Sequence, residues 1–209
     1  MAIQAVLTGD IVNSTKLTAA KETKLSNTLI DLFVDYDSKF EFYRGDSFQA
    51  YVKKAENALR LALLSRSAAI RLFKEEKIVL SDIRISIGIG EVTTPVRSLK
   101  TAKGEAFILS GRKLDEIIKN HQRLAITTSN PLANEGLQVI ADYLNTVFDT
   151  MTGKQAEVIF ELLKGEMQKV VAKKIKKTKS TIHQRITSGR WNEIEKLLQR
   201  YENIIKQIV

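Results

Sequence analysis

The sequence predicts an α+β protein in which a domain of β-α-β-β-α-β order precedes an all-helical domain. Over residues 1–130, short apolar or alternating runs separate longer segments of helical periodicity. From residue 131 onward, apolar residues recur at helical spacing. Of the 209 residues 44% are hydrophobic, which suffices for a core, and there is no Cys, which excludes disulfides and thiolate metal sites.

The first half of the mixed domain begins with a buried strand over residues 3–7, a short apolar run before Gly9. Helical periodicity follows over residues 16–40. Residues 40–43 and 48–52 predict a hairpin around a Gly-Asp turn. Residues 55–73 predict a helix with one narrow polar stripe, so most of its surface should be covered.

The second half contains a strand over residues 82–92, where isoleucine alternates with smaller or polar residues. Gly88 and Gly90 lie on its other face, which favours the close approach of another element. A helix over residues 104–118 and a strand over residues 124–127 complete a ferredoxin-like pattern.

That topology pairs the first strand with the third in antiparallel fashion. Asp10, after the first strand, and Asp46, before the third, should therefore lie at the same sheet edge. Paired carboxylates beside helix N–H groups suit a divalent cation, Mg²⁺ or Mn²⁺. Each Asp taken alone fits an ordinary turn residue equally well.

The C-terminal part is predicted as a connecting helix within residues 131–150 and a helix-turn-helix domain over residues 151–209. Thr152 should cap a helix over residues 154–164, and Thr178 should cap the second helix of a pair that begins at residue 166. Trp191 opens a terminal amphipathic helix.

The charge is concentrated in this part of the chain. Residues 150–209 hold 13 Lys and Arg against 6 Glu, or +7, whereas residues 1–149 hold 20 against 18 Asp and Glu, or +2. A basic appendage on a nearly neutral body is typical of polyanion binding, although solvated Lys-rich helices are common. No uncharged run is long enough to cross a membrane, so we expect a soluble, cytoplasmic protein.

The helix pair carries donors that suit phosphates and base edges in a major groove. We expect double-stranded DNA to be contacted by Lys177, Lys179, Ser180, Thr181, His183, Gln184, Arg185 and Arg190. The alternative is a helical hairpin that only packs. Lys176 and Lys177 stand at the joint, where a Gly and an apolar residue are common, so the turn is either strained or looser.

Four segments resemble the class III nucleotidyl cyclase domain: residues 6–15, 44–48, 85–92 and 104–114. The resemblance implies that Asp10, Ile11 and Asp46 bind metal and that Arg112 stabilises a transition state. It also implies that the backbone of Val12, Asn13 and Ser14 holds phosphates. The purine- and ribose-reading positions hold Phe42, Thr101 and Ile108 instead, and the late catalytic Lys is absent, so catalysis is not expected.

The whole chain is similar to the SatD-like family of small bacterial proteins. The resemblance rests on Gly-Asp-Ile-Val-Asn-Ser at residues 9–14, Gly-Asp-Ser-Phe-Gln at 45–49, Gly-Ile-Gly-Glu at 88–91, Thr-Gly-Lys-Gln at 152–155 and Gln-Lys-Val-Val-Ala at 168–172. It implies an architecture more than an activity.

These observations favour a homodimeric transcriptional regulator with a degenerate cyclase-like domain that binds a metal, a nucleotide or another phosphate-bearing effector. A divergent metal-dependent nucleotidyl cyclase or phosphotransfer enzyme that uses Asp10, Asp46 and Arg112 is the second hypothesis. A pair of interaction modules without a small-molecule site is the third.

Overall fold

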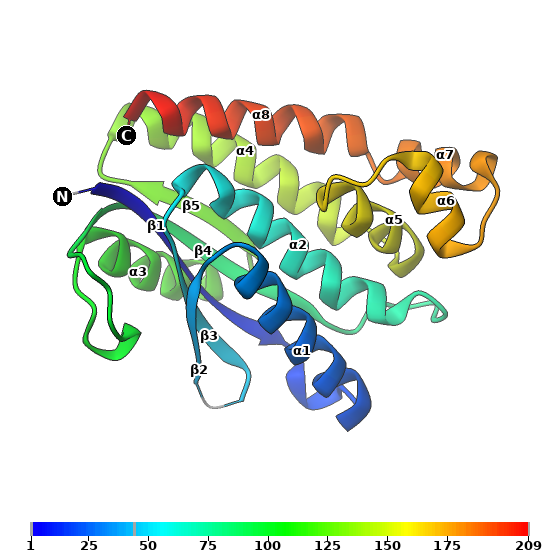
Figure 1. Cartoon of the computed structure of the whole chain (residues 1–209), viewed down its shortest axis with the longest axis horizontal. Coiled ribbons are helices and arrows are strands. Elements are labelled where there is room, and N and C mark those ends of the chain that lie inside the picture. The colour runs from blue at the N-terminus through cyan, green and yellow to red at the C-terminus, as the bar shows by residue number, and fades with distance from the viewer. Residues whose placement is uncertain (1, 44, 209) are drawn as a thin grey trace.

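The computed structural model describes residues 2–43 and 45–208 and is a mixed α+β structure. Its five strands form one sheet in the order β2-β3-β1-β4-β5 (Figure 1). Neighbouring strands are antiparallel except β4 and β5, which are parallel. The strands are β1 (Ala2–Val12), β2 (Lys39–Tyr43), β3 (Ser47–Val52), β4 (Asp82–Val92) and β5 (Leu124–Thr128). The predicted pairing of the first and third strands is confirmed.

Within the described ranges, the helices follow the predicted order with shifted ends. They are α1 (Ala19–Asp35), α2 (Ala58–Ile70), α3 (Glu105–Lys119), α4 (Pro131–Asp149), α5 (Gly153–Leu163), α6 (Gln168–Ile175), α7 (Lys179–Ser188) and α8 (Trp191–Ile208). The predicted caps are confirmed: Thr152 forms a capping box with Gln155, and Thr178 accepts a bond from the Thr181 N–H. The predicted helix over residues 16–40 is shorter, because Thr18 caps α1 and the chain re-enters the sheet at Lys39.

Strand β1 extends beyond the predicted end at residue 7. Its ladder with β4 continues through the pairs of Asp10 with Arg84 and Val12 with Asp82, so Asp10 lies within the sheet instead of in a turn. Gly9 permits this pairing, since a Cβ there would lie 2.6 Å from the Arg84 carbonyl oxygen. The long helix predicted from residue 16 begins at Ala19, so its N-terminus follows Asp10 by nine residues.

The sheet has helices on both faces. Leu7, Ile11 and the β4 isoleucines pack with α1, α2 and α4, and Val6, Tyr51 and Val92 pack with Ala106 of α3. The close approach predicted at the β4 glycines is made by α3. A Cβ on Gly88 would meet the Ala106 carbonyl oxygen and lie 2.5 Å from the Ser110 nitrogen.

Helix α2 is almost wholly buried, with 12 of its 13 residues inaccessible. Helices α1, α5 and α8 pack against it (Figure 1), and the Tyr201 hydroxyl of α8 donates to the Ala55 carbonyl oxygen at 2.7 Å. At Gly153 the start of α5 touches the chain after α2, since a Cβ would lie 2.5 Å from the Lys74 nitrogen. One hydrophobic core therefore crosses the boundary predicted at residues 150 and 151.

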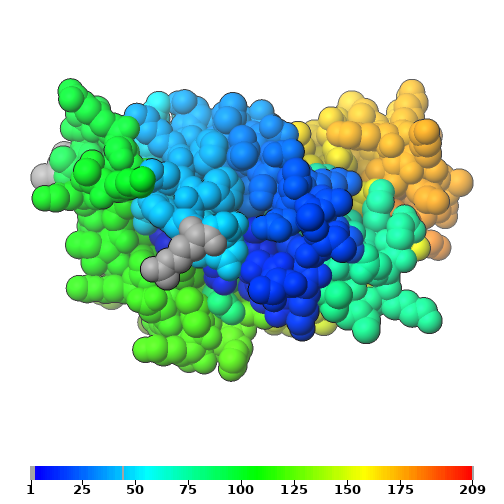
Figure 2. Space-filling model, turned by 90° about the horizontal axis from the view of Figure 1, so that it is seen from below, coloured from blue at the N-terminus to red at the C-terminus, as the bar shows by residue number. Residues whose placement is uncertain are grey.

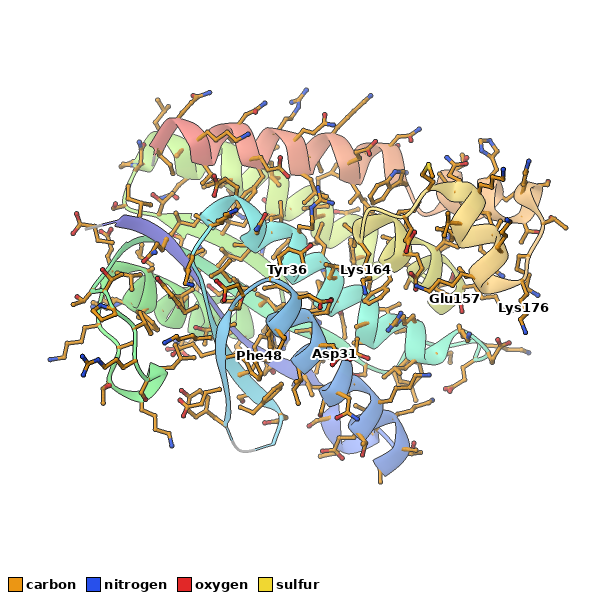
Figure 3. All side chains as sticks on the ribbon, viewed as in Figure 1. Asp31, Tyr36, Phe48, Glu157, Lys164 and Lys176 are labelled. Carbon is orange, nitrogen blue, oxygen red and sulfur yellow. The ribbon has the colours of Figure 1, made fainter. Side chains whose placement is uncertain are left out.

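The joint between α6 and α7 is a tight turn. Lys176 adopts a left-handed conformation (φ 53°, ψ 48°), and the Lys177 N–H donates to the Ala172 carbonyl oxygen at 3.0 Å. Helix α6 therefore ends with a left-handed residue and a hydrogen bond back to its last turn, a geometry in which the left-handed position is usually occupied by Gly. Figure 3 shows the Lys176 side chain at this joint, directed away from the body.

Replacing Lys176 by Gly is expected to raise the free energy of unfolding by about 0.5–1 kcal/mol, because Gly adopts the left-handed region without a Cβ clash. Urea denaturation measures the change. Lys177→Gly is the matched control: Lys177 has no positive φ, so its replacement should give no gain. Equal gains in both variants would contradict the assignment of strain to Lys176.

Candidate functional site

The two predicted metal-binding carboxylates lie together at one end of the β1–β3 pair. Asp10 pairs in register with Ser47, and the Ile11 N–H donates to the Asp46 carbonyl oxygen at 2.8 Å. The Ser14 hydroxyl donates to Asp46 Oδ2 at 3.1 Å. The topological argument from the sequence therefore placed these residues at the same edge correctly.

Asp10 also has a cationic partner. Arg84 Nη1 lies 3.2 Å from Asp10 Oδ2 and 3.4 Å from Oδ1, reaching it from the paired position on β4. Burial raises the pKa of the Asp10 carboxyl above its ordinary value, Arg84 opposes that shift, and the charge of Asp46 adds to it. Carboxylate and hydroxyl oxygens suit a hard divalent cation, but such a cation would compete with Arg84 for Asp10.

Around this edge, no group of three or more His, Cys, Asp or Glu side chains is close enough to hold a metal ion, as judged over the residues that the structure describes. The donor set described at this edge thus consists of two carboxylates and the Ser14 hydroxyl. It fits a weakly held, partly hydrated Mg²⁺ or Mn²⁺ better than a tightly caged ion.

The raised pKa of Asp10 gives a signed prediction. The folded state holds the Asp10 proton to higher pH than the unfolded chain, whose carboxyl has its ordinary pKa of 3.8, so ionisation of Asp10 destabilises the fold as pH rises. Asp10→Asn should match the parent in unfolding free energy near pH 3 and exceed it near about pH 7. Urea denaturation across this pH range measures the difference.

Asp37→Asn is the control of opposite sign. The Lys53 ammonium, 2.7 Å away, holds the pKa of Asp37 below its usual value, so stability from this pair is lost as pH falls. Asp37→Asn should therefore lose stability relative to the parent as pH rises. The same trend in both variants would refute the burial argument for Asp10.

The three residues predicted to hold phosphates have other contacts. Val12 is the last residue of β1, and Asn13 has a left-handed backbone (φ 55°) and donates from Nδ2 to the Leu80 carbonyl oxygen at 2.9 Å. Ser14 is bound to Asp46. Arg112 is exposed on α3, and no hydrogen bond or ion pair joins it to Asp10 or Asp46.

Phe42, at the purine-reading position of the cyclase pattern, contributes to the core. Its ring centroid lies 6.3 Å from that of Phe33 and 6.1 Å from those of Phe40 and Phe48. Ile108, at the ribose position, is 54% exposed. Neither side chain has a polar group with which to recognise a nucleotide.

A second surface is formed by α6, α7 and their joint, which lie at one end of the molecule (Figure 2). Residues 167–190 contain eight Lys and Arg and no Asp or Glu. Of the residues predicted to contact DNA, Thr181 is half-buried. Six are exposed: Lys177, Lys179, Ser180, His183, Gln184 and Arg190.

Two predicted DNA contacts are engaged within the chain. Arg185 Nη1 lies 3.4 Å from Glu157 Oε2, and both side chains are largely buried. Arg190 Nη1 donates to the Tyr143 hydroxyl of α4 at 2.9 Å. The flanking lysines Lys169, Lys173 and Lys176, which the sequence also favours for contact with the DNA backbone, are exposed.

Comparisons with known proteins concern the fold alone. No family model matches the chain, and no curated protein matches it. It is similar to a solved bacterial light-regulated adenylyl cyclase (18% identity, TM-score 0.43), with 60% of this chain and 75% of that chain covered. It is also similar to the adenylyl cyclase CyaB from P. aeruginosa (14%, TM-score 0.39, 55% and 71% covered) and to the guanylyl cyclase Cya2 (16%, TM-score 0.36, 55% and 70% covered). Across the described ranges, no helix is long and apolar enough to span a bilayer.

Proposed function

We propose that this chain binds double-stranded DNA through α6 and α7, arranged as a helix-turn-helix, and acts as a transcriptional regulator. The observation that carries the proposal is the acid-free basic segment over residues 167–190, most of whose cationic side chains are exposed. Neutralisation of DNA phosphates by such side chains releases counterions and supplies most non-specific affinity.

The arrangement of the two helices supports this choice over a purely structural hairpin. Ile182 and Ile186 anchor the buried face of α7, while Val171 and Ala172 anchor α6. The N-terminal half of α7 then faces solvent with Lys179, Ser180, His183 and Gln184. Recognition helices of this class contact base edges with their N-terminal residues.

The test is fluorescence anisotropy of a labelled duplex over a salt series. Lys177→Ala with Lys179→Ala is expected to weaken binding about tenfold or more and to reduce the slope of log K against log salt by about 2. Lys54→Ala with Lys103→Ala is the matched control. Both lysines are exposed and lie in the sheet-bearing part of the chain, and their substitution removes the same charge as the first pair. It should change neither quantity by a comparable amount.

Two results would overturn the proposal: no duplex binding at low salt, or an equal loss of affinity in both double variants.

His183→Ala with Gln184→Ala adds a separate measurement. These side chains are proposed to read bases, so their loss should reduce discrimination among duplex sequences without changing the salt slope. A homodimer, which palindromic sites favour, is tested by light scattering at the same protein concentration.

A second candidate function is binding of a divalent cation, with or without a phosphate-bearing effector, at Asp10 and Asp46. The convergence of these carboxylates with Ser14 supports it. Binding can be measured by titration with Mn²⁺, because the electron-paramagnetic-resonance signal of the free ion is lost when it binds. Asp46→Asn should bind Mn²⁺ more weakly than the parent. Arg84→Gln should bind more tightly, since it frees Asp10. Turnover of ATP or GTP with Mn²⁺ that is lost in Asp10→Ala would favour the enzyme hypothesis instead.

A further inference from the structure

A cavity of about 260 Å³ lies where β1 ends and where β4 and β5 begin, beside the C-terminal ends of α2 and α4. One wall is apolar and includes Ile70, Phe148 and Met151. Polar groups, among them Ser81 and Arg123, line the rest. Val12 and Asn13 line this cavity but Asp10 and Asp46 do not, so it adjoins the acidic edge described above without including its carboxylates.

Two side chains that line this cavity each carry a buried hydrogen-bond donor without a partner among the described residues. Ser81 is only 2% exposed, and neither its hydroxyl nor the buried Arg123 Nη1 bonds to any residue that the structure describes. Buried polar groups are almost always bonded, because an unsatisfied one costs its full desolvation energy. A hydroxyl and a guanidinium nitrogen that lack partners beside the same cavity together fit an anionic ligand group.

The neighbouring ion pairs show why Arg123 has no carboxylate partner among the described residues. Asp82 and Asp149 also line the cavity, but Arg66 binds both, with Nη2 lying 2.6 Å from Asp82 Oδ2 and 3.3 Å from Asp149 Oδ1. Arg84 is similarly paired with Asp10. Arg123 is thus the member of this arginine cluster that lacks a carboxylate partner among the described residues.

We infer that this cavity binds a small organic carboxylate whose anionic end is held by Arg123 and Ser81 and whose apolar body lies against Ile70, Phe148 and Met151. The planar guanidinium matches a carboxylate, and the two negatively charged Asp side chains in the lining disfavour a more highly charged group. The volume is below the range of drug-sized sites. It therefore suits a ligand of amino-acid size, smaller than a nucleotide. This inference is independent of DNA binding.

The methionines provide a direct reporter for the test. Met151 lines the cavity, whereas Met167 is 71% exposed on the far helix pair. With ¹³C-methyl methionine in the full chain, titration with 4-methylpentanoate should shift the Met151 signal and leave that of Met167 unchanged. The uncharged 4-methylpentanamide, which has the same shape, and inorganic phosphate, which has no apolar body, should both bind at least about tenfold more weakly.

Two variants test the named donors. Arg123→Gln is expected to weaken binding of 4-methylpentanoate about tenfold or more, and Ser81→Ala about threefold, the second without loss of fold because its hydroxyl has no partner to lose. Arg97→Gln is the matched control, because Arg97 is exposed in the loop before α3. An unmoved Met151 signal, equal binding of the amide, or unchanged affinity in Ser81→Ala would overturn the inference.

Discussion

Arg66→Ala is expected to lower the free energy of unfolding by about 3–5 kcal/mol, the cost typical of breaking a buried ion pair from one side. Arg66 is fully buried in α2. Its guanidinium binds Asp82 and Asp149, donates to the Asn145 side-chain oxygen at 3.2 Å and lies 4.8 Å from the Phe148 ring centroid. Urea denaturation followed by circular dichroism measures the loss.

The control separates charge from packing. Arg66→Met with Asp82→Asn removes the charges of Arg66 and of its closer partner while retaining an apolar side chain, so it should lose less stability than Arg66→Ala alone. Arg60→Ala, six residues earlier on the same helix, removes a partly exposed Arg that lies 3.5 Å from Glu202, and should cost about 1 kcal/mol or less. If Arg66→Ala lowers the free energy of unfolding by no more than Arg60→Ala, the ion-pair network around Arg66 does not stabilise the fold.

Gly88→Ala is expected to lower the free energy of unfolding by about 3 kcal/mol, the upper end of the typical range for overpacking. The added methyl would meet the Ala106 carbonyl oxygen and the Ser110 nitrogen. Both are backbone atoms of α3, so relief requires displacement of the whole helix from β4. Chemical denaturation measures the effect.

Gly111→Ala is the matched control on α3 itself. A Cβ at Gly111 meets nothing within 4 Å, and Ala is favoured over Gly inside a helix by about 0.5–1 kcal/mol. The two Gly→Ala changes should therefore act in opposite directions. A Gly88→Ala variant as stable as the parent would mean that α3 does not sit against β4 as described.

Local patterns in the sequence predicted most elements because each has a strong period or cap. The alternating isoleucines define β4 to the residue, and Thr152 and Thr178 mark helix starts. The predicted end of β1 at residue 7 was wrong, because Gly9-Asp10 has the composition of a turn although β1 continues to Val12. Only the ladder with β4, which depends on a strand 70 residues later, shows that the pair lies within the sheet.

For the candidate sites, topology was more informative than composition. Strand order alone brought Asp10 and Asp46 to one edge. The partners of Arg185 and Arg190 were not predictable, because Glu157 and Tyr143 lie 28 and 47 residues away and on other helices. The pairing of Arg84 with Asp10 depends on register, which the alternation of a single strand does not reveal.

The burial of α2 bears on how the chain folds as it is synthesised. Helix α2 precedes β4 in the chain, yet α5 and α8 supply part of its cover, and Tyr201 closes the contact near its N-terminal end. When residue 150 leaves the ribosome, a long apolar helix surface is still open to solvent. Nascent chains of this length should therefore remain sensitive to protease and attract chaperones, with stable folding delayed until the last helix has emerged.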